Sequence, residues 1–155
     1  MYYITEDFKQ LIQNLGGEWN DQKKRPIVCL MQSTEHPDLY WAIPVGKVNH
    51  RDDKAMERIK SFMNKPTRDL RCCYYHIGRT TNKSIFFPIT DKYISEEHLG
   101  SDNKLHIIKN PHLLQSLHYK LNRILNFEAS NKNYFRQHIT DLKIHLLREL
   151  ESKKV

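Results

Sequence analysis

The hydrophobic residues follow helical spacing in two segments of the first half of the chain. In 5–15 the apolar positions fall on one face, Thr5 can cap the first turn, and Gly16-Gly17 can stop the helix. In 52–65 the same spacing recurs, and the acidic first turn suits the positive end of the helix dipole. We therefore predict a helix in each segment.

The C-terminal third predicts two longer helices. The first begins near Pro111 and the second at about Asn133. Their apolar stripes are Leu113, Leu114, Leu117, Leu121, Ile124 and Leu125 in the first helix, and Phe135, Ile139, Leu142, Leu146, Leu147 and Leu150 in the second. Such stripes most simply face the core of the protein, and we interpret them so rather than as a membrane surface or a cofactor pocket.

Short apolar runs between the predicted helices are typical of strands. They are 26–31, 39–45, 71–77, 84–89 and 104–108. Pro44 cannot donate to a strand ladder, so we expect it at a strand end or a bulge. Strands followed by helices, without regular alternation, predict an α+β fold with a mainly antiparallel sheet.

Composition and charge narrow the class of protein. The 155 residues suit one domain, 1–155, and 39% hydrophobic with 28% charged residues is ordinary for a globular chain. The formal net charge is +7 and the sequence pI is about 9.3. Such an excess attracts polyanions, of which nucleic acid is the commonest in a cell. The alternative is that the positive charge only keeps the protein soluble.

The sequence predicts a cytoplasmic protein. No apolar run approaches the roughly 20 residues that cross a bilayer, and the first residues lack the pattern of a signal peptide. The cysteines Cys29, Cys72 and Cys73 are odd in number and form no CxxC pair, which argues against disulfides and a zinc site. We expect all three to be reduced, and we expect neither a metal nor another cofactor.

The segment 43–50 has the most chemical character. An apolar strand ends at Gly46 and Lys47, and His50 follows three residues later. Glycine allows close backbone approach, lysine can lie against a phosphate, and histidine can move protons near neutral pH. The alternative is a strand-end turn with solvated polar residues.

A second candidate is the segment 74–84. Strand alternation would place Tyr74 and His76 on one face, and the following loop offers Arg79 and Lys83. Aromatic rings beside cations suit single-stranded RNA, whose bases stack while its phosphates pair with positive charge. The alternative is an ordinary hairpin with a structural histidine. RNA carries its own nucleophile, the 2′-hydroxyl, so lysine, histidine, serine and threonine suffice to cut it without a metal.

The order of these elements resembles the toxins of type III toxin–antitoxin systems, of the ToxN, AbiQ, TenpN and CptN group, and most of all the CptN/TenpN branch. The resemblance spans nearly the whole chain. It is carried by the Tyr-rich start and first helix, the basic-led strand 24–28, the strand 40–45 running into Gly46-Lys47, the strands at 76–78 and 84–89, and the C-terminal helices. ToxN carries Thr-Ser before its lysine, whereas this chain has Gly46 there.

The resemblance implies a strongly curved, mainly antiparallel sheet related to the MazF/Kid toxins, surrounded by helices. It implies a metal-independent endoribonuclease that leaves a 2′,3′-cyclic phosphate and a 5′-hydroxyl on cellular or phage RNA. It also implies an inhibitor, a small structured antitoxin RNA of the pseudoknot kind. The toxin would cut that RNA from a repeat precursor and hold it in a closed ring of alternating protein and RNA.

Site residues follow from the segments and the resemblance together. We expect Lys47 to bind the phosphate or donate a proton, and His50 and His76 to be base and acid in either order. Thr80 and Ser84 are candidates for the missing hydroxyl. The predicted RNA contacts are Lys24, Arg25, Tyr40, Gly46, Arg79 and Lys83. Two other classes stay open, namely a non-catalytic RNA- or DNA-binding regulator and a protein-interaction module built on the C-terminal helices.

Overall fold

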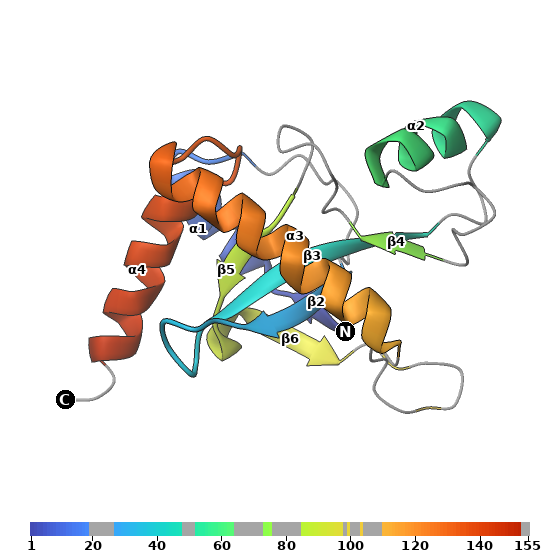
Figure 1. Ribbon diagram of the computed structural model, residues 1–155. Helices are drawn as coiled ribbons and strands as arrows, with labels where there is room; N and C mark the ends of the chain where they lie inside the picture. Colours follow the sequence, from blue (N-terminus) through green and yellow to red (C-terminus); the bar gives the residue numbers. More distant parts are fainter. Residues whose placement is uncertain are drawn as a thin grey trace.

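The computed structural model describes residues 1–18, 27–47, 52–63, 73–75, 85–97, 99, 103 and 110–152 (Figure 1). The elements are β1 (Tyr2–Ile4), α1 (Glu6–Asn14), β2 (Ile27–Gln32), β3 (Tyr40–Lys47), α2 (Asp53–Met63), β4 (Cys73–Tyr75), β5 (Phe87–Ile89), the 3₁₀ turn η3 (Asp91–Tyr93), β6 (Ile94–Glu97), α3 (Pro111–Ser130) and α4 (Ile139–Ser152). This mixture confirms the predicted α+β class. None of the helices in these ranges is long and apolar enough to cross a membrane.

The sheet has the strand order β4-β3-β2-β1-β6, and β5 also pairs with β3. Every pairing among the described strands is antiparallel, as predicted. The sequence did not predict β1 or β6, which are short and depend on each other and on β2 for their hydrogen bonds. The predicted strand 104–108 lies outside the described residues.

Strand β3 pairs with three other strands. Two of them, β5 and β4, follow one another along the same edge of β3. On that edge β5 pairs Phe87 with Ala42, and β4 pairs Tyr75 with Val45. Eleven positions, 76–86, separate the paired residues of β4 and β5 in the chain. Their partner positions on β3 are separated by only two residues. The two chemical segments of the sequence thus meet along one strand.

Pro44 lies inside β3, opposite Val28, and not at the strand end or bulge that was expected. Trp41 lies opposite Pro88, which has no N–H to donate, so Trp41 directs its own backbone groups toward β2. Backbone groups alternate sides along an antiparallel strand, so Pro44, three residues later, faces the gap between β4 and β5. No described strand lies opposite Pro44 on that side, so its missing N–H breaks no hydrogen bond among the described strands.

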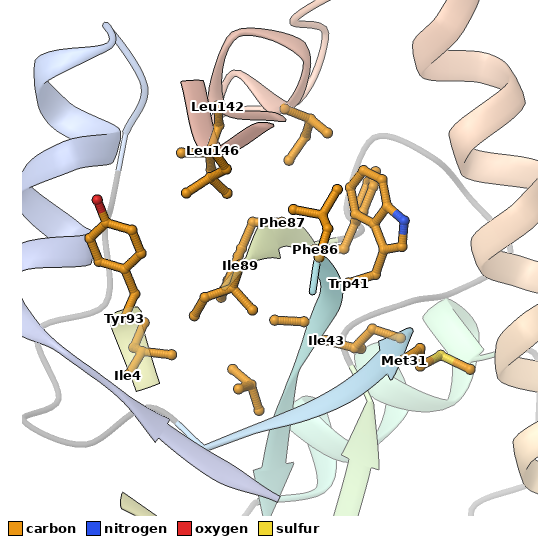
Figure 2. Close-up of a cluster of buried hydrophobic side chains, with 14 of the residues drawn as sticks. Ile4, Met31, Trp41, Ile43, Phe86, Phe87, Ile89, Tyr93, Leu142 and Leu146 are labelled. Atoms are coloured by element: carbon orange, nitrogen blue, oxygen red, sulfur yellow. The ribbon is translucent and has the colours of Figure 1, made fainter. Parts of the chain in front are cut away.

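The core fills the space between the sheet and the helices (Figure 2). Aromatic rings link the layers, with ring centroids 5.3 Å apart for Phe8 of α1 and Phe87, and 5.8 Å apart for Trp41 and Phe86. The predicted cap is confirmed, because the Phe8 N–H donates to the Thr5 hydroxyl at 3.2 Å. Figure 2 shows Leu142 and Leu146 of α4 above the β5 side chains, so the α4 stripe faces the core as predicted.

The connection between α3 and α4 corrects one prediction. The second C-terminal helix begins at Ile139, not at about Asn133, because Asn133 and His138 have the positive φ angles 60° and 51°. The buried carboxylate of Glu128 holds this connection by accepting from the Asn133 N–H at 2.7 Å and from the Thr140 hydroxyl. A helical repeat of apolar residues cannot reveal such a local hydrogen-bonded loop.

Candidate functional site

One end of the sheet joins the segments that carry most of the predicted site residues. There β3 pairs Lys47 with Cys73 and Val45 with Tyr75. The antiparallel hairpin places the start of β2, at Ile27, at this same end. Consequently β2 and β4 begin, and β3 ends, within a few residues of one another. We call this region, defined by Ile27, Val45–Lys47 and Cys73–Tyr75, the Lys47 end of the sheet.

Two predicted site residues belong to the described backbone of this end. Gly46 lies opposite Tyr74, and Lys47 is the last residue of β3. Eight other predicted site residues lie outside the described residues, namely Lys24, Arg25, His50, His76, Arg79, Thr80, Lys83 and Ser84. In the chain, the first two precede β2, His50 follows β3, and the last five lie between β4 and β5.

The β3–β4 register brings together parts of the chain that are far apart in the sequence. Lys47 and the segment 76–84 are about 30 positions apart in the sequence, yet β3 and β4 place their described neighbours side by side. The segments that join this end carry lysine, arginine or histidine at positions that include 24, 25, 47, 50, 51, 76, 79 and 83. Positive charge with proton-transfer groups can bind a phosphate and act as acid and base beside it.

Tyr40 lies at the opposite end of β3. It pairs with Gln32 and Ile89, and seven residues of extended strand separate it from Lys47 by about 23 Å. Burial, followed by the charges of Asp91 and Asp38, raises the pKa of the Tyr40 hydroxyl. The structure thus does not bring Tyr40 together with Lys47, and its predicted role in RNA stacking stays a prediction.

A second cluster of titratable groups lies on α4 and η3, and the sequence reasoning missed it. Glu149 accepts hydrogen bonds from the Tyr93 hydroxyl at 2.8 Å and from Lys92 Nζ at 2.8 Å. His145 Nε2 lies 3.0 Å from the same carboxylate. The spacing of His145 and Glu149 by four residues was a usable signal, but their partners from η3 lie more than 50 positions away.

The pKa shifts in this cluster reflect hydrogen bonds that its groups make with one another. Burial alone would raise the pKa of Glu149, but the hydrogen bonds from Lys92 and Tyr93 outweigh burial and lower it. Burial, and then the bond to the carboxylate, raise the pKa of Tyr93 to about 12. The hydrogen bond to Glu149 also raises the pKa of Lys92. Because the groups satisfy one another, we interpret the cluster as holding η3 against α4.

Metal ligands are not grouped in the described ranges, where no three His, Cys, Asp or Glu side chains could together hold an ion. No family model matches the chain, and no curated protein is detectably similar to it.

Proposed function

We propose that this chain is a metal-independent endoribonuclease that acts at the Lys47 end of the sheet. The observation that carries the proposal is the β3–β4 register, in which Val45 lies beside Tyr75 and His76 follows Tyr75 directly in the chain. Two segments with phosphate-binding and proton-transfer groups, separate in the sequence, are joined by a single strand pairing. The net charge of +7 supports a polyanionic substrate.

The proposed reaction uses the nucleophile of RNA itself. One histidine, His50 or His76, removes the proton of the 2′-hydroxyl, and the oxygen attacks the adjacent phosphorus. The bond from phosphorus to the 5′-oxygen breaks, the other histidine gives its proton to that oxygen, and a 2′,3′-cyclic phosphate remains. Lys47 offsets the negative charge that accumulates on the phosphate oxygens. Thr80 or Ser84 supplies a hydroxyl donor to the same oxygens.

We further propose that the protein is the toxin of a type III toxin–antitoxin system. The order of elements described above supports this proposal, together with the α+β class and the antiparallel sheet. Its inhibitor would be a small structured RNA that the toxin itself cuts from a repeat precursor. Cutting and inhibition would then use one RNA-binding surface, and protein and RNA would alternate in a closed assembly.

The test is incubation of purified protein with cellular RNA in the presence of EDTA, followed by analysis of the new RNA ends. We expect 2′,3′-cyclic phosphate and 5′-hydroxyl ends, and a discrete small RNA that co-purifies with the protein. Cutting that requires an added metal, or 3′-hydroxyl products, would contradict the proposed chemistry. Binding without any cutting by the wild-type protein would instead favour a non-catalytic RNA- or DNA-binding regulator.

A further inference from the structure

The solvent-facing side of α3 differs in charge from the rest of the described helical surface. Its exposed polar and aromatic residues between Pro111 and Phe127 are His112, Gln115, His118, Tyr119, Asn122, Arg123 and Asn126. None of them is a carboxylate. The single acid of this 20-residue helix, Glu128, is only 4% exposed and is bonded to the α3–α4 connection.

The other helices carry acids on their exposed residues. Those acids are Glu6 and Asp7 in α1, Asp53 and Glu57 in α2, and Asp141 and Glu151 in α4. Surface helices of soluble proteins ordinarily mix both signs of charge, because opposite charges one turn apart stabilise the helix. The long α3 lacks this mixture, so its composition calls for an explanation other than solubility.

Tyr119 and Arg123 give this side of α3 a specific chemistry. Tyr119 is 70% exposed, the most of any large apolar or aromatic side chain in the described ranges. Arg123 follows four residues later, on the same side of the helix, and has no ion-pair partner among the described residues. An exposed ring beside an unpaired guanidinium suits a nucleic-acid strand, since bases stack on rings and phosphates pair with arginine.

The inner side of α3 fixes the outer side in place. Leu117, Leu121 and Ile124 are buried in the same core as the sheet, and α3 lies across β2 and β3 in Figure 1. The exposed residues from His112 to Asn126 therefore form a rigid stripe about 21 Å long. A stripe that is already ordered loses little entropy on binding an extended strand.

We propose that the exposed side of α3, defined by His112, Gln115, Tyr119, Asn122, Arg123 and Asn126, binds single-stranded RNA. Phosphates pair with Arg123, while a base stacks on Tyr119. The amides of the stripe donate to phosphate and sugar oxygens. This surface goes beyond the proposed cleavage, because it would serve a protein that binds RNA without cutting it.

The test measures the binding of single-stranded 2′-O-methyl RNA, which has no free 2′-hydroxyl and is not cut by the proposed reaction. Fluorescence anisotropy across a salt series gives both the affinity and its salt dependence. We expect Tyr119→Ala to weaken binding about tenfold, and Tyr119→Phe to keep most of the affinity. Arg123→Ala is expected to weaken binding severalfold and to reduce the slope of log K against log salt by about 0.7.

The matched control is Arg148→Ala on α4, an exposed arginine of the same charge outside the stripe. It should leave the salt slope unchanged, and circular dichroism melts should show that all the variants are folded. Equal effects of Arg123→Ala and Arg148→Ala would overturn the proposal. So would wild-type protein that binds phosphatidylserine vesicles and not RNA.

The two proposals can fail separately. If Lys47→Ala stops RNA cutting while Tyr119→Ala and Arg123→Ala bind RNA normally, the α3 surface is wrong and the cleavage stands. If the α3 variants lose binding while the wild-type protein never cuts RNA, the cleavage is wrong and the surface stands.

Discussion

The two ends of strand β3 differ in the charged residues that lie near them in the structure or follow them in the chain. At the Tyr40 end, the described side chains include Asp38 and Asp91, whose charges help to raise the pKa of Tyr40, and Glu149 with its partners lies on the neighbouring η3 and α4. At the Lys47 end, the joining segments carry the cluster of lysine, arginine and histidine described above. At the Tyr40 end, Glu149 and Glu35 have hydrogen-bonded or ion-paired partners, whereas the sequence next to the Lys47 end is rich in basic residues.

This difference indicates that the two ends of β3 have different roles, one in stability and one in the proposed reaction. The Tyr40 end is tied down by hydrogen bonds between η3 and α4 and by the 3.0 Å ion pair of Lys143 with Glu35, which joins α4 to the β2–β3 hairpin. Under the proposed mechanism, stability and RNA cutting then depend on different residues. Substitutions at the two ends should therefore separate loss of activity from loss of stability.

The largest expected effect is at the Lys47 end. Lys47→Ala should lower the rate of RNA cutting by about 100-fold or more, because it removes positive charge from the reacting phosphate. Lys47→Arg should recover part of the rate. The measurement is the initial rate of cutting of a fluorescent RNA.

Lys143→Ala is the matched control, since it removes a lysine and its ion pair with Glu35 at the other end of β3. It should cut RNA at the wild-type rate. Comparable losses in Lys47→Ala and Lys143→Ala would mean that overall charge, and not position, decides the activity.

The next effect is on stability at the Tyr40 end. Glu149→Ala should lower the free energy of unfolding by about 2 kcal/mol, because it leaves the partly buried Tyr93 hydroxyl without its acceptor. Urea melts of the folded protein measure this loss, and the cutting rate should not change. An unchanged melt would show that the cluster is not the tie we describe.

The stabilisation by Glu149 should also depend on pH. Its pKa is lower in the folded than in the unfolded state, so its contribution is present above the ordinary glutamate pKa and disappears as the pH falls through the lowered value. The difference in stability between wild type and Glu149→Ala should therefore become smaller in acid. A difference of the same size above and below that range would contradict the assigned hydrogen bonds.

A smaller effect concerns Tyr93. Tyr93→Phe should cost about 1 kcal/mol by removing one hydrogen bond to a carboxylate. The neutral hydroxyl is favoured in the folded state, so this contribution is complete below the ordinary tyrosine pKa near 10 and is lost as the pH rises through about 12. Tyrosinate absorbance should show a late-titrating group that is missing in Tyr93→Phe, and identical titration curves would refute the shift.

The smallest expected effect is on RNA binding at the Tyr40 end. If a base stacks on Tyr40, the RNA must reach about 23 Å from Lys47, into a region that carries Asp38 and Asp91. Tyr40→Ala should therefore weaken the binding of a long RNA by less than about threefold, and it should not alter the cutting of a dinucleotide. A tenfold loss with the dinucleotide would erase the contrast between the two ends.

The sequence predicted the elements whose signals are local. The Thr5 cap and the Gly16-Gly17 stop define α1, and Pro111 begins α3. It failed where distant contacts decide, since β1 exists only through its pairing with β2 and β6. The start of α4 was misplaced because left-handed residues and the buried Glu128 shape the loop before it.

For the site, the sequence identified two segments but could not show that they meet. The register of Val45 with Tyr75 depends on which strands pair, and pairing depends on packing of the whole sheet. The Glu149 cluster was missed for the same reason, because Tyr93 and Lys92 reach it only through the fold. The apolar pattern that predicts α3 says nothing about its exposed side. The scarcity of acids in this helix is nevertheless visible in the sequence.

The most direct test of the central claim is a double-mutant cycle on RNA cutting with Lys47→Ala and His76→Ala. If both side chains act on one phosphate, the losses of cutting rate caused by the two substitutions are not independent. The double variant should then cut RNA hardly more slowly than the less active of the two single variants. If the two fold-losses simply multiply, or if either single variant cuts at the wild-type rate, the two segments do not share a site and the proposed mechanism is contradicted.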